Sequence, residues 1–241
     1  MAKTRFPYVL TLLAVVLLAV LVSLGTWQVN RLQWKVGLID AAEAAHNMPP
    51  APLEQVLASD APEFRQVIAT CRGLNTAAFV ELRTIDRGEA GVRLASACPL
   101  SDGTTIMVDR GFVRQDDTAR PAVDAARSMP VTFAGVLRQP TKASGMTPAP
   151  QGLVFYGRDN EAMAKALGVT GPVSSWVLYA ATAINPEVPQ VHPVVPPPAF
   201  TNNHLGYALT WFGLAAALIV LYAVLLRRRL VRKADSQGQR N

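Results

Sequence analysis

Histidine and cysteine are scarce in this 241-residue chain, which contains three histidines and two cysteines. Cys71 and Cys98 form no CxxC or CxxxC pair and no histidine lies near them in the sequence, which argues against a metal centre. Phosphate-binding loops of the GxGxxG or GxxxxGK type and the HExxH motif are also absent. The residue spacing gives no support to a Ser-His-Asp triad built on His192, so we do not expect an enzyme.

Charged residues are also few, 17% against 50% hydrophobic residues, which excludes disorder as the dominant state. The net charge of +6 is concentrated at the two ends of the chain. Lys3 and Arg5 are the only charged residues before Arg31, and six basic residues with Asp235 follow Asn203, whereas residues 31–203 hold 15 basic and 16 acidic residues. A nucleic-acid-binding surface would carry its positive charge on one folded face, so we expect no nucleic acid partner.

Two long uncharged runs lie beside these basic ends, from Phe6 to Asn30 and from Leu205 to Leu226. Each is long enough to cross a hydrocarbon core of about 30 Å at about 1.5 Å per residue. We therefore predict transmembrane helices over residues 8–29 and 204–226. For the first run the alternative is a signal peptide cleaved near Ser23-Leu24-Gly25, although the run is longer than the apolar region of most signal peptides.

The distribution of basic residues predicts the orientation, because basic flanks remain cytoplasmic. Five basic residues closely follow the second run and none lies near its start, so we expect the tail 227–241 in the cytoplasm. Because the chain would cross the membrane twice, the tail 1–7 is then also cytoplasmic. Residues 30–203 would then form a periplasmic-side domain of a protein in the bacterial inner membrane, in contact with membrane lipid. Such a compartment permits disulfides, and a Cys71–Cys98 disulfide and two half-buried thiols both remain open.

The domain between the two runs has an α+β pattern. The spacing of Leu32, Val36 and Ile39 indicates that the first helix continues until MPPAP ends it. One further helix is predicted over Asn160–Leu167, with Asp159 as N-cap and Gly168 at its end. Short β-type segments predict a mostly antiparallel sheet, open or closed into a barrel, over Phe64–Arg72, Ala77–Thr84, Val92–Cys98, Thr104–Val113, Val131–Leu137, Leu153–Tyr156 and Trp176–Ala181.

Two local features complete the predicted fold. Ser101-Asp102-Gly103 stands between two of the β-type segments at the spacing of a hairpin turn. The proline-rich stretch 188–198 predicts an extended strap that leads back to the membrane. We thus expect a membrane α+β protein, with two transmembrane helices flanking a mostly antiparallel β extracytoplasmic domain that has one or two short helices.

The start of the second run holds the most unusual group of side chains. His204, Tyr207 and Trp211 are spaced three and four residues apart, so they share one helix face, and Gly206 lies beside them. The first run has Gly25, Trp27, Gln28 and Arg31 at the matching depth. Gly25 and Gly206 would allow the two helices to approach closely there.

This group has two interpretations. The aromatic side chains can form an ordinary interfacial belt, with His204, Asn202 and Asn203 capping the helix and Arg31 contacting lipid phosphate. Alternatively, the imidazole of His204 can bind the iron of a porphyrin that lies among the aromatic rings and glycines, with Arg31 facing the propionates.

The motifs LGTWQVNRLQWK (24–35) and NNHLGYALTWFGLA (202–215) resemble those of the surfeit locus protein 1 family, whose members assemble cytochrome c oxidase. The resemblance covers nearly the whole chain and includes VLRQPTKASGMTP (136–148) and YGRDNEAMAKALG (156–168). GTTIMVDRGFV (103–113) resembles a family strand in which Asn, Trp and Pro take the places of Asp109, Phe112 and Arg114. Arg110 and Gly111 are retained, and roles at the three changed positions are in doubt.

The resemblance implies a protein that binds haem a, with His204 as ligand to the haem iron, and aids its insertion into the catalytic subunit of cytochrome c oxidase. Haem a synthase is a further partner to consider. The alternative is a membrane scaffold that stabilises an early oxidase intermediate without a direct role for haem. An electron carrier would need a second axial histidine, which the sequence does not place.

Overall fold

The computed structural model describes residues 7–140, 143–196 and 202–238, and the chain divides into a helical unit and a sheet unit, residues 41–198. Predictions on Lys3, Arg5, residues 197–198, Thr201 and residues 239–241 lie outside the described residues. The helical unit consists of most of α1 (Tyr8–His46) and of α4 (His204–Gly238). Both helices are long and apolar enough to cross a membrane, as judged by length and composition.

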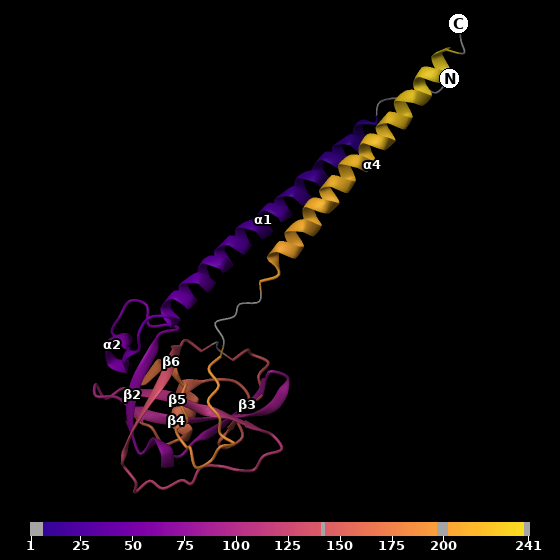
Figure 1. The fold of residues 1–241 in the computed structure, drawn as a ribbon. Helices are drawn as coiled ribbons and strands as arrows, with labels where there is room; N and C mark the ends of the chain where they lie inside the picture. The colour runs from indigo at the N-terminus through magenta and orange to yellow at the C-terminus, as the bar shows by residue number, and fades with distance from the viewer. Residues whose placement is uncertain (1–6, 141–142, 197–201, 239–241) are drawn as a thin grey trace. The chain divides into compact units, whose positions relative to one another are not determined.

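The two long helices lie side by side and run antiparallel (Figure 1). The Thr11 Oγ1 is 2.6 Å from the Tyr222 Oη, and Gly25 contacts the ring of Phe212 further along the pair. As the spacing of apolar residues predicted, α1 continues well beyond the uncharged run, and it ends just before the prolines of the MPPAP segment. The backbone of α4 also stays helical beyond Leu226 into the basic tail.

The described residues of the sheet unit form eight strands and three short helical segments (Figure 1). The helical segments are α2 (Leu53–Leu57), the 3-10 turn η1 (Leu74–Thr76) and α3 (Asn160–Ala166). The strands are β1 (Ala51–Pro52), β2 (Gln66–Arg72), β3 (Val80–Asp86), β4 (Glu89–Pro99), β5 (Thr105–Arg114), β6 (Pro130–Arg138), β7 (Val154–Phe155) and β8 (Val173–Ala180).

Among the described residues the strands pair in the order β1-β2-β6-β8-β5-β4-β3-β7. Four pairings are antiparallel, and the pairings β1–β2, β3–β7 and β5–β8 are parallel. Most of the pairing is antiparallel, as the sequence predicted, and the three parallel pairings make the sheet mixed. The reason is that β8 enters between β5 and β6 from a distant part of the chain, and such a non-local neighbour leaves no periodic signal in the sequence.

Several local predictions are confirmed. Strands β4 and β5 form the antiparallel hairpin that the Ser101-Asp102-Gly103 turn predicted, and Gly103 has a φ of +83°. The carboxylate of Asp159 caps α3 by accepting the Ala162 N–H at 3.0 Å. Gly168, with a φ of +82°, follows the end of α3, where a left-handed residue commonly ends a helix.

A disulfide joins Cys71 of β2 to Cys98 of β4, with 5.6 Å between the two Cα atoms. These strands are not neighbours in the sheet, because β6, β8 and β5 lie between them in the pairing order. The sheet must therefore curl until β2 and β4 meet. Both cysteines belong to the main core, which also includes Leu137 and Leu178. A second core lies under α3, around Met163.

The proline-rich segment that follows β8 is fastened to the sheet through its backbone carbonyls. Val194 O accepts from the Arg93 guanidinium at 2.9 Å, and Pro196 O accepts from that of Arg138 at 2.8 Å. His192 and Phe112 form an isolated antiparallel bridge. Over residues 188–196, the described part of the predicted strap, the chain follows the sheet without a helix or a long strand, and a turn at 189–190 interrupts its extended course.

Candidate functional site

His204 is the first residue of α4, and its ring faces a polar side chain of α1. The His204 Nδ1 lies 2.6 Å from the Oε1 of Gln28, which is 9% exposed. Because an amide oxygen only accepts, the Nδ1–H of His204 donates the hydrogen bond to Gln28. In the neutral ring the other nitrogen, Nε2, then keeps a lone pair. A neutral imidazole oriented in this way is suited to bind a metal ion or a haem iron.

Small residues bring the two helices together around this hydrogen bond. A Cβ built on Gly25 would lie 2.7 Å from Phe212 Cε1, so only glycine leaves room for that ring. Ala208 and Ala215 are almost fully buried along the same side of α4. The predicted contribution of Gly25 to close helix approach is therefore confirmed.

Gly206 does not take the part in helix packing that the sequence predicted. A Cβ at Gly206 would have no neighbour within 4 Å. Gly206 follows His204 by two residues, which places it about 200° further around the helix, away from the side that faces Gln28. A side chain at position 206 would thus face open space on the opposite side of α4 from His204, rather than a helix contact.

The three predicted aromatic residues, Trp27, Tyr207 and Trp211, do not contact His204, the candidate iron ligand. Tyr207 and Trp211 fall within about 60° of His204 around the helix axis, as their spacing predicted. Trp27 and Tyr207 are 56% and 57% exposed, and Trp211 is half-buried. Within the described part of the chain, no hydrogen bond or ring contact joins any of them to His204.

The remaining predicted residues are separate from the ring of His204. Arg31 is exposed, and its guanidinium carbon lies 4.1 Å from the centroid of the Trp34 ring, a cation–π contact along α1. Asn203 O accepts the first helical hydrogen bond of α4, from Tyr207 N–H at 3.3 Å. The Asn202 Oδ1 is buried and accepts no hydrogen bond among the described residues, so it does not form the expected side-chain cap.

A buried ionic group occupies the centre of the sheet unit at Asp109, one of the positions whose role the sequence left in doubt. Asp109 is 1% exposed and accepts from the guanidinium groups of Arg93, at 3.1 Å, and of Arg158. Both guanidinium groups also lie over the ring of Tyr179, the register partner of Asp109 on β8. A single carboxylate therefore holds residues of β4, β5 and the segment before α3 together.

The neighbouring Arg110 binds neutral oxygens instead. It stands at the β-bulge between β4 and β5, which turns its side chain inward. Its guanidinium donates to Asn75 O, Ala77 O, Ser96 Oγ and Asn185 Oδ1. Burial lowers the pKa of Arg110 to about 10, and the nearby charge of Glu187 partly offsets this effect.

The next residue, Gly111, has a φ of +144°, and a Cβ there would lie 2.6 Å from His192 O. Arg110 and Gly111 thus serve the fold, as does Phe112, which is 1% exposed and meets the His192 ring edge to face.

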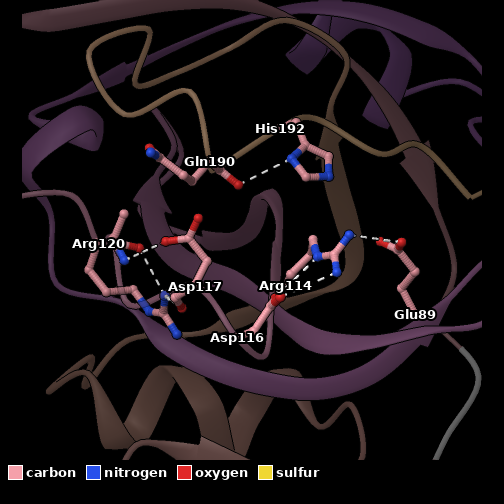
Figure 2. Close-up of polar contacts among 8 residues, drawn as sticks. Glu89, Arg114, Asp116, Asp117, Arg120, Gln190 and His192 are labelled. Carbon is pink, nitrogen blue, oxygen red and sulfur yellow. Dashed lines mark hydrogen bonds and ion pairs between the residues drawn. The ribbon is translucent and has the colours of Figure 1, made fainter.

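Within the described part of the chain, the side chain of His192 makes one hydrogen bond. Figure 2 shows the polar contact of this side chain, from Nδ1 to the backbone carbonyl of Gln190 at 3.1 Å. Nearby, Arg114 pairs with Glu89 at 3.0 Å and with Asp116 at 3.1 Å beside an open cavity of about 430 Å³. Arg114 thus has two carboxylate partners, and all three side chains are exposed. Among the described residues, no group of three or more His, Cys, Asp or Glu side chains could hold a metal ion.

Comparison with known proteins identifies the family of this chain. The model of the SURF1 family matches residues 15–216, a range that includes Gln28, Asp109 and His204. This chain belongs to the SURF1 family. The resemblance of its two helix motifs is thereby confirmed.

Several members of the SURF1 family are similar over most of this chain. Surfeit locus protein 1 of Mus musculus is 29% identical over 221 residues, which cover 83% of this chain and 70% of the mouse protein. A SURF1-like protein of Rickettsia bellii is 24% identical over 241 residues, covering 98% and 96% of the two chains. The cytochrome oxidase assembly protein SHY1 of Saccharomyces cerevisiae is 37% identical over 101 residues, 40% of this chain and 26% of the yeast protein.

Sequence reasoning about this SURF1 chain missed the importance of Gln28. It placed Gln28 at the depth of His204 but counted only aromatic, basic and glycine residues as site candidates. The available signal was an amide side chain near the end of an uncharged run, since a polar group in such a helix needs a partner within the protein. His204 is the partner that the fold provides.

Proposed function

We propose that this chain is a membrane-anchored, non-enzymatic cytochrome oxidase assembly factor that holds haem a through His204 and aids its insertion into the oxidase catalytic subunit. Membership of a family that includes a cytochrome oxidase assembly protein supports the assembly role. The observation that carries the haem part is the hydrogen bond between Gln28 and His204. It fixes the imidazole with Nε2 as the nitrogen that has the free lone pair.

The residues around His204 fit a large planar cargo. The Nε2 of His204 would hold haem a through its iron, which would supply the metal for this imidazole to ligate. The exposed side chains of Trp27 and Tyr207 offer apolar surface on both helices, and Trp211 shares the helix face of Tyr207. Arg31, stacked on Trp34, supplies a fixed positive charge for a propionate. A single strong iron ligand, His204, also suits a haem that must be transferred to another protein.

The proposed location is the bacterial inner membrane, with the sheet unit on the periplasmic side and both termini in the cytoplasm. The basic residues after Leu226 support this orientation. The Cys71–Cys98 disulfide fits a periplasmic domain, since structural disulfides persist in oxidising compartments. The expected partners are the oxidase catalytic subunit and haem a synthase, with lipid around α1 and α4.

The test is the haem content and visible spectrum of full-length protein purified in mild detergent from cells that make haem a. We expect wild type to carry haem a and His204→Ala to lose most of it, while the amount of protein in the membrane stays the same. His46→Ala is the matched control, because that histidine is exposed at the end of α1.

Two results would contradict the haem role. One is equal haem content in His204→Ala and wild type. The other is absence of haem from both proteins while oxidase assembly still depends on the chain, which would favour the scaffold function. Loss of His204→Ala protein from the membrane would be resolved by His204→Gln, which keeps a polar side chain of similar size opposite Gln28.

A further inference from the structure

The sheet unit has a cleft along β2, at the place where β1 ends. The cleft has a volume of about 570 Å³. Its floor is β2 from Ile68 to Arg72, and its sides are formed by Pro52–Glu54 and by Pro99–Ser101. Pro130, the register partner of Arg72, completes the lining.

The backbone of β2 is open to pairing beside this cleft. Gly73 N–H donates to Met129 O, and Leu137 N–H donates to Arg65 O, so the odd-numbered residues of β2 direct their backbone groups to β6. The even-numbered residues therefore direct theirs to the opposite edge. On that edge β1 pairs only with Val67 and Ile68, and among the described residues no strand pairs with Thr70 and Arg72.

The side chains of the cleft are partly apolar and include two opposite charges, those of Glu54 and Arg72. Ile68 is 42% exposed, and Met129, next to Pro130, is 75% exposed. The carboxylate of Glu54 accepts from Ser101 Oγ at 2.6 Å. Arg72 is exposed and forms no ion pair within the described part of the chain. An occupant should therefore offer apolar side chains and a negative charge.

The disulfide ties the floor of the cleft to one of its sides. Cys71 lies between Thr70 and Arg72 on the floor, and Cys98 directly precedes Pro99 on one side. The bond between them prevents these segments from moving apart. A cleft fixed in this way is preorganised, which lowers the entropy lost on binding.

We propose that this cleft binds an extended acidic segment of a partner protein, which adds to the edge of β2 as a short strand. Main-chain groups that face outward on a sheet edge are satisfied by another main chain in extended form. The unpaired edge from Thr70 to Arg72 is roughly 7 Å long at about 3.3 Å per residue, which suits a strand of about three residues. An acidic side chain of that segment pairs with Arg72. This binding surface is independent of haem binding at His204.

Fluorescence anisotropy on the full-length protein in detergent micelles tests the proposal. The probe is a fluorescein-labelled hexapeptide of alternating valine and threonine with one glutamate. A second peptide has lysine in place of glutamate, and a third has N-methyl groups on alternate backbone nitrogens. We expect wild type to bind the glutamate peptide about tenfold more tightly than either of the other two peptides. Each of those peptides loses about one charged or backbone hydrogen bond, and a loss of that size changes the dissociation constant by about tenfold.

Variants of β2 separate edge pairing from other kinds of binding. Thr70→Pro removes the outward N–H, which the sheet itself does not use for the β2–β6 pairing, and should weaken binding about tenfold. Thr70→Val is the matched control, because it loses only the hydroxyl contact with Thr132. Arg72→Ala should abolish the preference for glutamate over lysine.

Equal binding of the N-methylated and unmodified peptides by wild type would overturn the proposal, even if Thr70→Pro did not fold. Unchanged binding by a folded Thr70→Pro protein would also overturn it. A dimer of the wild type that Thr70→Pro converts to monomer in size-exclusion chromatography would assign the edge to a second copy of the chain instead.

Discussion

The His204 Nδ1 lies 2.6 Å from the Gln28 Oε1, although 176 positions separate the two residues in the chain. The contact joins the first residue of α4 to the middle of α1. It gives the histidine a defined tautomer and orientation, which a histidine at a free helix end does not have. Gln28 thus orients His204, the proposed haem ligand, without itself contacting the haem.

We expect Gln28→Leu to weaken haem binding by about tenfold or more, the range found when a group that orients a metal-binding histidine is lost. Gln28→Glu keeps an acceptor for Nδ1 and should retain more of the affinity. The measurement is a haem titration of purified protein followed by absorbance. Gln33→Leu, an exposed position on the same helix, should bind as wild type does. Wild-type affinity in Gln28→Leu would show that the hydrogen bond has no part in binding.

The disulfide supports a prediction about stability. Replacing both cysteines by alanine removes a crosslink between positions 27 residues apart, and should lower the free energy of unfolding by about 3–4 kcal/mol. The loss reflects the larger freedom of the unfolded chain and the weaker hold on the curled sheet. Denaturant unfolding of the full-length protein measures it. Wild type under strong reductant should fall to the same stability, whereas unchanged stability in both samples would contradict the prediction.

The parts of this fold that follow from local pattern could be predicted from the sequence. The strands β2 to β8 alternate or cluster apolar residues, the Ser101-Asp102-Gly103 turn sets one hairpin, and Asp159 and Gly168 mark the ends of α3. The uncharged runs likewise predicted two long apolar helices. Each of these features is decided by residues close together in the chain.

The parts that depend on distant residues could not be predicted. The position of β8 beside β5 and the curl that brings Cys71 to Cys98 are set by packing of the whole sheet. For the same reason Asp109 could be noted as a changed position, but its partners Arg93 and Arg158 could not be named. In the candidate site, His204 was found from its type and location, whereas Gln28 required knowledge of which helix faces meet.

Asp109 and its arginine partners should be strongly coupled in their effects on the free energy of unfolding. Asp109→Asn leaves two buried guanidinium groups without a carboxylate, and should reduce the free energy of unfolding by about 3 kcal/mol or more. Arg158→Met combined with Asp109→Asn should recover part of this loss, because one uncompensated charge is gone. A double-mutant cycle from denaturant unfolding measures the coupling. Additive effects of the two substitutions would show that the ion pair is not coupled.

The pH dependence of stability should include a contribution from Glu187. Its carboxylate accepts from Asn185 Nδ2 at 2.6 Å, and this hydrogen bond is the main reason that its pKa is lowered, with smaller contributions from its own backbone N–H and from Arg110. A carboxyl group with a lowered pKa binds fewer protons in the folded protein than in the unfolded one. Its stabilising effect is therefore complete above the unfolded pKa of about 4.5 and is lost as the pH falls through the folded pKa.

We therefore expect the thermal midpoint of wild type to fall further than that of Glu187→Gln when the pH is lowered from about 6 to about 3, across the range in which a carboxyl group titrates. The amide oxygen introduced by Glu187→Gln would still accept from Asn185, so the two proteins should differ little in structure at the higher pH. Because the hydrogen bond contributes more than the charge of Arg110, the difference should persist in high salt, where charge interactions are screened. Parallel pH profiles for the two proteins would show that Glu187 does not contribute. A difference that disappears in salt would instead assign the effect to Arg110.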